Sequence, residues 1–140
     1  MRSRSDCPVS FALDLFGDTW SLLVIRDMVF EGKRRYNDFL TSEEGIATNI
    51  LSNRLLSLEH AGIIKKIPDV QHPKKSVYLL TDAGINLLPI LVELVLWSTE
   101  YDPQECPPDA FVRSAKRDKT GLIRKMKADI KKRQRLYMRG

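Results

Sequence analysis

The stretch that decides the fold is IATNILSNRLLSLEHAG, residues 46–62. Its apolar residues recur at steps of one, four and three, which is the period of a helix with one buried stripe. They are Ile50, Leu51, Leu55 and Leu58. Gly62 is expected to end the helix, because only glycine adopts the left-handed capping conformation without a steric cost.

The opposite face of this predicted helix carries short side chains that can both donate and accept hydrogen bonds. They are Thr48, Asn49, Ser52, Asn53 and Ser57. An ordinary solvated face would carry lysine and glutamate, whereas short polar groups suit the major groove of DNA, where asparagine can pair with adenine. We therefore expect base contacts from Asn49, Ser52 and Asn53, with Thr48 in second place. The alternative is a polar face without a partner.

Length and composition exclude several other classes of protein. The 140 residues, 43% of them apolar, suit one domain with or without an extension. No run of about 18 residues is uniformly apolar, so no membrane span is expected, and the N-terminus lacks the apolar region of a secretory signal. The distant Cys7 and Cys106 form no metal-ligand pattern, which favours a reducing cytoplasm.

No arrangement of residues typical of a catalytic or cofactor site stands out. His60 and His72 lack metal ligands at a suitable spacing, so both are expected at the surface. The chain shows no Ser-His-Asp order, no glycine-rich phosphate loop and no close pair of carboxylates. We expect neither enzymatic activity nor a metal or cofactor.

The net charge of +5 is unevenly distributed along the chain. Residues 109–140 hold 12 Lys/Arg and 3 Asp/Glu, so this tail alone carries a net charge of +9. Residues 33–75 form a second basic zone, with 8 basic and 5 acidic side chains. Two separate basic zones indicate an acidic partner more strongly than the net charge of the whole chain does.

The remaining pattern predicts helices around a two-stranded hairpin. The predicted helices cover residues 7–16, 19–29, 36–40, 81–101 and 120–137, and the strands cover 63–67 and 76–80. Thr81 and Asp82 should cap the helix over 81–101, Pro89 should kink it, and residues 102–109 read as a linker. That helix is apolar on all sides between Leu87 and Trp97, which predicts a subunit interface.

Three short helices, a polar-faced helix and a hairpin follow the order of a winged helix-turn-helix, and here the sequence also resembles the HxlR-type regulators of the MarR group. The matching residues are Cys7-Pro8-Val9, Gly17, Trp20, Arg35-Tyr36-Asn37-Asp38-Phe39-Leu40, Gly45-Ile46, Leu51, Arg54-Leu55, Leu58-Glu59, Gly62-Ile63-Ile64, Val77-Tyr78-Leu79-Leu80-Thr81, Gly84, Leu88-Pro89 and Trp97. The resemblance covers about residues 7–103. It implies a homodimeric, DNA-binding repressor or activator that dimerises through its first helix and the long helix after the hairpin.

Two departures from the family pattern concern the ends of predicted helices. Asp18 and Thr19 precede Trp20, where the family often has a basic residue. Ala47 stands where many members have a capping side chain, and alanine is a poor cap. Thr48 is then the alternative cap, which would remove it from base contact.

Basic side chains supply the expected contacts to the DNA backbone. Arg34 and Arg35 precede the third helix, and Lys74 and Lys75 stand at the tip of the hairpin, or wing. For these four the alternative is a solvated surface. Arg54 is expected to bind a phosphate or a base, or else to fold back as a structural arginine on Asp38 or Glu59. Base contacts set specificity, whereas these charged contacts set affinity and register.

Cys7 precedes Pro8 at the start of a helix, whose dipole favours the thiolate over the thiol. In members of the resembled family a cysteine at this place acts as a sensor of oxidants or electrophiles. The resemblance therefore makes Cys7 a candidate redox sensor, and the alternative is a small buried hydrophobe. Cys106 lies in the proline-rich linker and reads as incidental.

The predicted dimer interface combines three apolar segments. Its residues are Phe11 on the first helix, Leu91, Leu94, Val95 and Trp97 on the long helix, and Ile123, Met126 and Ile130 on the basic last helix. The last three are included because they need a cover; phosphate contacts or simple solvation are the alternatives for that helix. Apolar residues around Trp97 could also line a site for a small-molecule inducer between the subunits.

The sequence thus predicts a mainly α protein with a small β-hairpin, an α+β class. Residues 7–105 are expected to form the winged helix-turn-helix domain, with a long dimerisation helix, and residues 106–140 a linker and a basic C-terminal helix. The predicted function is homodimeric, sequence-specific regulation of transcription at a pseudo-palindromic site in double-stranded DNA. The alternative is a winged-helix module for protein–protein assembly.

Overall fold

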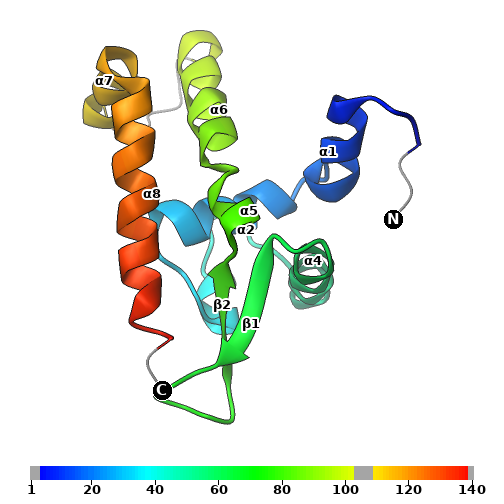
Figure 1. Cartoon of the computed structure of the whole chain (residues 1–140). Coiled ribbons are helices and arrows are strands. Elements are labelled where there is room, and N and C mark those ends of the chain that lie inside the picture. The colour runs from blue at the N-terminus through cyan, green and yellow to red at the C-terminus, as the bar shows by residue number, and fades with distance from the viewer. Residues whose placement is uncertain (1–3, 103–108, 139–140) are drawn as a thin grey trace. The chain divides into compact units, whose positions relative to one another are not determined.

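The computed structural model describes residues 4–102 and 109–138 and divides into two compact units between Gly84 and Ile85 (Figure 1). The first unit contains α1 (Pro8–Phe16), α2 (Ser21–Phe30), α3 (Tyr36–Phe39), α4 (Thr48–His60), β1 (Ile64–Pro68) and β2 (Ser76–Leu80). The second contains α6 (Leu88–Tyr101), α7 (Asp109–Arg117) and α8 (Lys119–Arg135), and α5 (Asp82–Ile85) spans the division. The predicted fold class is confirmed.

The predicted stripe of α4 forms the centre of the first unit. Leu51, Leu55 and Leu58 are buried, and Ile50 is half-buried. α4 packs against both α1 and β1. Burial of three leucines fixes which face of α4 points outward, because a rotated helix would expose them.

Gly62 makes the turn from α4 into the hairpin. Its φ is +75°, and its N–H donates to the carbonyl of Glu59 (3.0 Å) while the N–H of Ile63 donates to that of Leu58 (3.0 Å). These bonds satisfy carbonyls that the helix end would leave unpaired. The predicted glycine stop is confirmed, and it places β1 directly after α4.

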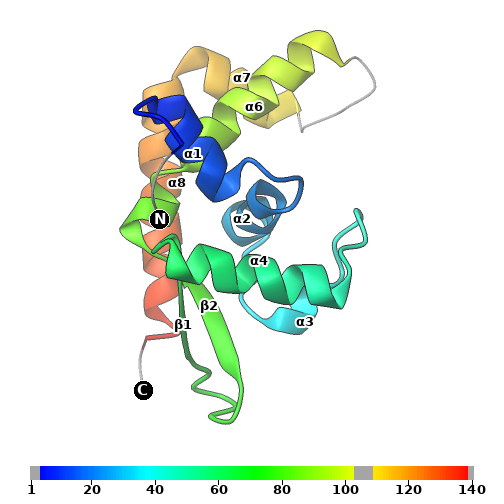
Figure 2. The ribbon, with the colours of Figure 1, turned by 90° about the vertical axis from the view of Figure 1, so that its right-hand side faces the viewer.

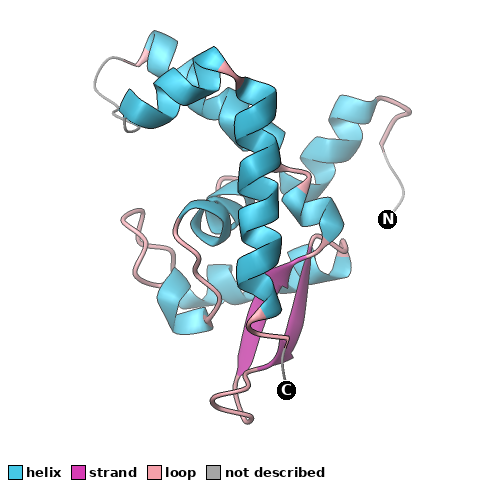
Figure 3. Ribbon diagram, turned by 60° about the vertical axis from the view of Figure 1, so that its left-hand side comes forward, coloured by secondary structure: helices cyan, strands magenta, loops and turns pink. Residues whose placement is uncertain are grey.

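The hairpin pairs β1 and β2 antiparallel, in a register that runs from Ile64 opposite Leu80 to Pro68 opposite Ser76 (Figure 3). Residues 77–80 of β2 are buried, whereas Lys65 and Lys66 of β1 are exposed. The N–H of Tyr78 donates to the carbonyl of Arg34 (2.7 Å). The hairpin is therefore bonded to the segment before α3, and β2 also packs against α3 itself.

The expected single helix over 81–101 is two helices. The hydroxyl of Thr81 accepts the N–H of Gly84 (3.2 Å), as predicted for a cap, but a turn at residues 86–87 separates α5 from α6. The predicted mid-helix kink is therefore wrong: Pro89 lies in the first turn of α6, where a missing N–H costs nothing.

The segment Asp82–Tyr101 is long and apolar enough, by length and composition, to cross a membrane. One third of it is buried in protein, and the core helices of soluble proteins have the same composition.

The second unit contains a helix that the sequence analysis missed. α7 buries Val112 and Ala115, which stand at the i, i+3 spacing of one helix face. α8 packs against both α7 and α6, and it buries Ile130 and Gln134. The predicted last helix is thus confirmed within two residues at each end, whereas most of the predicted linker, residues 103–108, lies outside the described part of the chain.

Candidate nucleic-acid interface

The exposed face of α4 presents the predicted base-contacting side chains together. Asn49, Ser52 and Asn53 are exposed on the side opposite the buried leucines, and α4 crosses the first unit with the hairpin beginning at its C-terminal end (Figure 2). Leu56 belongs to the same stripe, at steps of seven and three from Asn49 and Asn53, and 53% of it is exposed. Leu56 was not among the residues predicted to contact bases, although its spacing from the two asparagines places it on the same face.

The first turns of α4 are held by Tyr36 of α3. Ala47 caps α4 without a side-chain hydrogen bond, so the expectation that Thr48 caps the helix is wrong. The Tyr36 hydroxyl donates to the Thr48 carbonyl (3.0 Å) and lies 3.1 Å from the Ser52 hydroxyl. Thr48 is therefore exposed as the first helical residue, and Ser52 shares its hydroxyl with a neighbouring helix.

Asp18, one of the departures from the family pattern, holds the start of α2. Its Oδ2 accepts the N–H groups of Trp20 (2.9 Å) and Ser21 (3.0 Å), and its Oδ1 accepts the Ser21 hydroxyl (2.5 Å). Partial burial raises the pKa of Asp18, but the bonds from Ser21 and Trp20 and the charge of Arg54 outweigh it, so the pKa lies below its usual value.

Arg54 connects α4 to this carboxylate. Its Nη1 lies 3.4 Å from Asp18 Oδ1, and its Nη2 donates to Asn53 Oδ1 (2.5 Å). The structural arginine foreseen as an alternative is thus present, with Asp18 as its partner in place of Asp38 or Glu59. Arg54 orients Asn53 on the exposed face and remains partly exposed.

Both arginines before α3 were predicted to bind phosphates, but in the structure both have partners within the protein. Arg34 is 2% exposed, and its Nη1 donates to the carbonyls of Met28 (2.7 Å) and Lys33 (2.8 Å), so its guanidinium is structural and the prediction is wrong for it. Arg35 Nε donates to Asp69 Oδ2 (2.7 Å) at the hairpin tip. Its side chain stays one-third exposed.

The wing tip is ordered by Asp69 and presents lysines. The Asp69 carboxylate accepts the N–H of Gln71 (3.0 Å), its backbone N–H donates to the Lys75 carbonyl (2.9 Å), and the hydrogen bond from Arg35 lowers the pKa of Asp69 to about 2. Lys74 and Lys75 are exposed, and neither has a carboxylate partner in the described part of the chain. Both ammonium groups are thus available to an anion.

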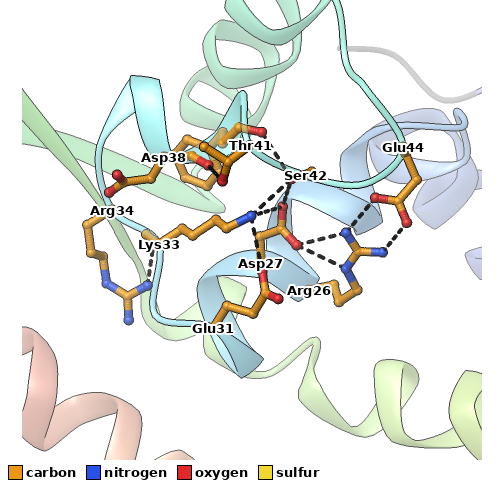
Figure 4. Close-up of polar contacts among 10 residues, drawn as sticks. Arg26, Asp27, Glu31, Lys33, Arg34, Asp38, Thr41, Ser42 and Glu44 are labelled. Carbon is orange, nitrogen blue, oxygen red and sulfur yellow. Dashed lines mark hydrogen bonds and ion pairs between the residues drawn. The ribbon is translucent and has the colours of Figure 1, made fainter. Parts of the chain in front are cut away.

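A buried carboxylate fixes the turn that leads into α4 (Figure 4). Asp27 of α2 is 2% exposed, and its Oδ1 accepts Arg26 Nε (3.0 Å) and Nη2 (2.8 Å). Its Oδ2 accepts the Ser42 hydroxyl and lies 3.4 Å from Lys33 Nζ. Arg26 also forms a two-bonded pair with Glu44 (2.7 and 2.8 Å), which lowers the pKa of Glu44 to about 2.

This network was not predicted from the sequence. Its one signal is a charged residue, Asp27, at a position where the period of α2 requires burial. A buried charge is stable only with partners, and here the partners come from α2, the segment after it and the turn before α4. Asp27 therefore positions α4 without facing the exposed surface.

Cys7 is exposed and immediately precedes α1. Its backbone N–H bonds Ser5 Oγ (3.3 Å) and its carbonyl accepts the N–H of Phe11 (3.0 Å). The thiol does not fill the core of the chain, so the alternative of a small buried hydrophobe is wrong for the single chain. Cys106 lies outside the described residues.

Apolar side chains are exposed on α1 and, separately, along one face of α6. On α1 they are Val9, Phe11 and Leu13; on α6 they are Ile90, Leu94, Trp97 and Tyr101, at the i, i+4, i+7, i+11 spacing of one helix face. Trp97 is 65% exposed, and its ring lies 5.1 Å from that of Tyr101. Such faces are typical of subunit contacts.

Two residues predicted for the dimer interface are interior residues. Leu91 and Ile130 are buried within the single chain, so neither is free to contact a second subunit. Val95, Ile123 and Met126 are half-buried. The cover that the apolar side of α8 requires comes from its own chain, through α6 and α7.

No cluster of three or more histidine, cysteine or acidic side chains that could hold a metal ion occurs among residues 4–102 and 109–138. A helical core, a helix with an exposed polar stripe and a basic two-stranded wing define a winged helix-turn-helix protein, a class of DNA-binding transcriptional regulators. The chain belongs to the HxlR-like helix-turn-helix family, whose model matches residues 15–106.

Individual relatives agree with this assignment. The chain is 39% identical over 101 residues to the uncharacterised HTH-type transcriptional regulator Rv3095 of Mycobacterium tuberculosis, a match that covers 71% of this chain and 63% of the relative's length. The structure of the present chain is similar to that of PA1607, crystallised as a candidate transcription factor (TM-score 0.67, 38% identity, 75% of this chain and 73% of PA1607). It is also similar to the reduced form of the redox regulator HypR (TM-score 0.59, 32% identity, 67% and 92%).

Proposed function

We propose that the protein is a homodimeric transcriptional regulator that reads a pseudo-palindromic DNA site with α4. The observation that carries the proposal is the exposed stripe of Asn49, Ser52, Asn53 and Leu56 on a helix whose other face is locked by buried leucines. Asparagine amides can bond the adenine edge in the major groove, and an apolar side chain can contact the thymine methyl group. One face can therefore recognise several adjacent bases.

Charge around α4 supports the same function. Lys74 and Lys75 stand at the tip of a wing that Arg35 and Asp69 hold in place. In a winged helix-turn-helix these positions meet the backbone or the minor groove beside the reading helix. We propose that the two lysines bind phosphates, and that Arg35, one-third exposed, mainly fixes the wing.

A dimer is the proposed active form, because exposed apolar side chains on α1 and α6 require a cover. A two-fold axis would place two copies of α4 in successive major grooves, about 34–36 Å apart. Leu94→Glu combined with Trp97→Glu should convert the dimer to a monomer in size-exclusion chromatography with light scattering. A wild-type protein that is monomeric at all concentrations would contradict this part of the proposal.

Selection of genomic DNA fragments by the purified protein tests the function directly. We expect enrichment of an inverted repeat, and loss of that preference in Asn49→Ala/Asn53→Ala. Asn86→Ala is the matched control, because Asn86 is an exposed asparagine outside α4. If wild type enriches no sequence, the specific function is wrong, and a winged-helix module for protein assembly becomes the better explanation.

The exposed thiol at the start of α1 supports a response to oxidants or electrophiles, and HypR, a similar protein, is described as a redox regulator. We propose Cys7 as the responsive group. In a Cys106→Ser background, an electrophile should modify Cys7, as detected by mass spectrometry, and change affinity for the selected repeat. Modification of Cys7 with unchanged DNA affinity would remove this role and leave an inducer site near Trp97 as the remaining route to a signal.

A further inference from the structure

The outer face of α8 carries a basic stripe, within which Ala128 is the one exposed apolar residue. Its members are Arg124, Lys125, Lys131, Lys132 and Arg135, all exposed. At 100° per residue they fall within about one-third of the helix circumference, and from Arg124 to Arg135 they extend over about 16 Å. The one carboxylate of α8 itself, Asp129, lies outside this arc.

The stripe has no internal partner to neutralise it. Elsewhere on α8, Lys119 pairs with Glu93 and Lys127 donates to Asn86 (2.9 Å). The side chains of the five stripe residues make no ion pair or hydrogen bond within the described part of the chain. Five like charges on one helix face repel one another, which an ordinary solvated helix avoids by mixing in acidic residues.

The opposite face of α8 already has its cover. Ile130 and Gln134 are buried, Ile123 and Met126 are half-buried, and α6 and α7 pack against the helix. α8 is therefore held in place by its inner face while its outer face is left to an anionic partner. The HxlR-like match ends at residue 106, so this surface is an addition to the family domain.

We propose that the basic stripe of α8 is a second DNA contact, which binds phosphates of double-stranded DNA. This inference rests on the proposed DNA-binding function. Double-stranded DNA carries one negative charge per about 1.7 Å of axis, so a 16 Å row of cations meets several phosphates. Arginine and lysine without intervening carboxylates suit a phosphate backbone, and such contacts add affinity independent of sequence.

The test is the salt dependence of binding to a duplex that contains the selected repeat and to one of random sequence. Arg124→Gln/Lys131→Gln/Arg135→Gln removes three stripe cations and keeps helix propensity. Each phosphate contact contributes about 0.9 to the slope of log affinity against log salt, so this variant should flatten the slope by up to about 2.7 per protomer on both duplexes. Its preference for the repeat over random DNA should stay unchanged.

Arg113→Gln/Lys116→Gln/Arg117→Gln is the matched control, because it removes three exposed cations from the neighbouring α7. An equal effect of both triple variants, or no effect of either, would overturn the proposal. If the wild type shows no sequence preference but the stripe variant alone loses slope, the inference stands while the proposed specific function fails.

Acetylation of lysines provides a readout that needs no substitution. DNA should protect Lys125, Lys131 and Lys132 from acetylation more than Lys116, as measured by mass spectrometry. Equal labelling with and without DNA, or protection only by vesicles of phosphatidylserine and phosphatidylcholine, would assign the stripe to another partner and contradict the proposal.

Discussion

Removal of the Asp27 carboxylate should lower the free energy of unfolding of the first unit more than removal of any exposed charge around it. Asp27→Ala leaves the Ser42 hydroxyl and the Lys33 ammonium without their buried acceptor. Loss of one partner of a buried ion pair costs about 3–5 kcal/mol when the remaining charge is left uncompensated. Here Lys33 keeps Glu31 (3.0 Å) and Arg26 keeps Glu44 (2.7 Å), so the lower end of this range applies. We expect a loss of this size in the free energy of unfolding.

Two further variants separate charge from shape. Asp27→Asn keeps an oxygen for Arg26 but turns an N–H donor toward Lys33 and Ser42, so about half of that loss should remain. Glu44→Gln breaks only the outer pair with Arg26, in which both side chains are about one-third exposed. Partly exposed pairs contribute about 0–1 kcal/mol, so this variant is the control.

Urea denaturation followed by tryptophan fluorescence measures these differences. Trp97→Phe removes the exposed tryptophan of α6, so the signal comes from Trp20, which lines the same pocket as Asp27. An Asp27→Ala loss no larger than that of Glu44→Gln would refute the reasoning that burial makes this carboxylate important. Circular dichroism on the same samples shows whether the helices unfold together.

Three other perturbations test the wing, the exposed face and the packing of α5. Arg35 holds the pKa of Asp69 at about 2, below the usual aspartate value of 3.8, so the stabilisation that this carboxylate provides is complete above pH 3.8 and is lost as the pH falls toward 2. Arg35→Gln should raise this pKa toward 3.8 in an NMR titration of the carboxyl carbon. Replacing the contacted thymine of the selected repeat by uracil should weaken wild-type binding about fourfold, the effect of one buried methyl group, and leave Leu56→Ala unaffected; wild-type indifference to every uracil would refute the contact. Gly84→Ala should cost about 1–3 kcal/mol in thermal unfolding, because a Cβ there would lie 2.2 Å from the carbonyl oxygen of Ile63.

Periodicity predicted those parts of the fold that depend on local sequence. The leucine stripe of α4, the glycine stop after it and the hairpin each follow from neighbours a few residues apart. Periodicity did not predict the turn at residues 86–87, which lies within an apolar run. Leu87 is buried there, as it would be if the helix continued, so its apolar character does not distinguish a turn from a helix. α7 was missed because five of its nine residues are polar or charged, although Val112 and Ala115 stand at the spacing of one helix face.

The candidate site shows a different limit of sequence reasoning. Exposed residues such as Asn49 and Lys74 were predicted because their residue types suit DNA. Arg34, Arg35 and Arg54 suit DNA equally well, but their partners are buried carbonyls or acids brought close only by the fold. Asp69 lies 34 residues beyond Arg35 and Asp18 lies 36 before Arg54, so no local pattern could assign Arg35 and Arg54 a structural role.

These partners divide the residues around α4 into those that hold the helix and those left to read DNA. Tyr36 holds its first turns, Arg54 ties its middle to Asp18, and Asp27 fixes the turn before it. A helix tied to its surroundings in this way reaches the groove with its side chains already oriented, so little ordering opposes binding. Substitution of a holding residue should therefore weaken stability and all DNA binding together. Substitution of Asn49, which lies free on the exposed face, should change the preferred sequence at unchanged stability.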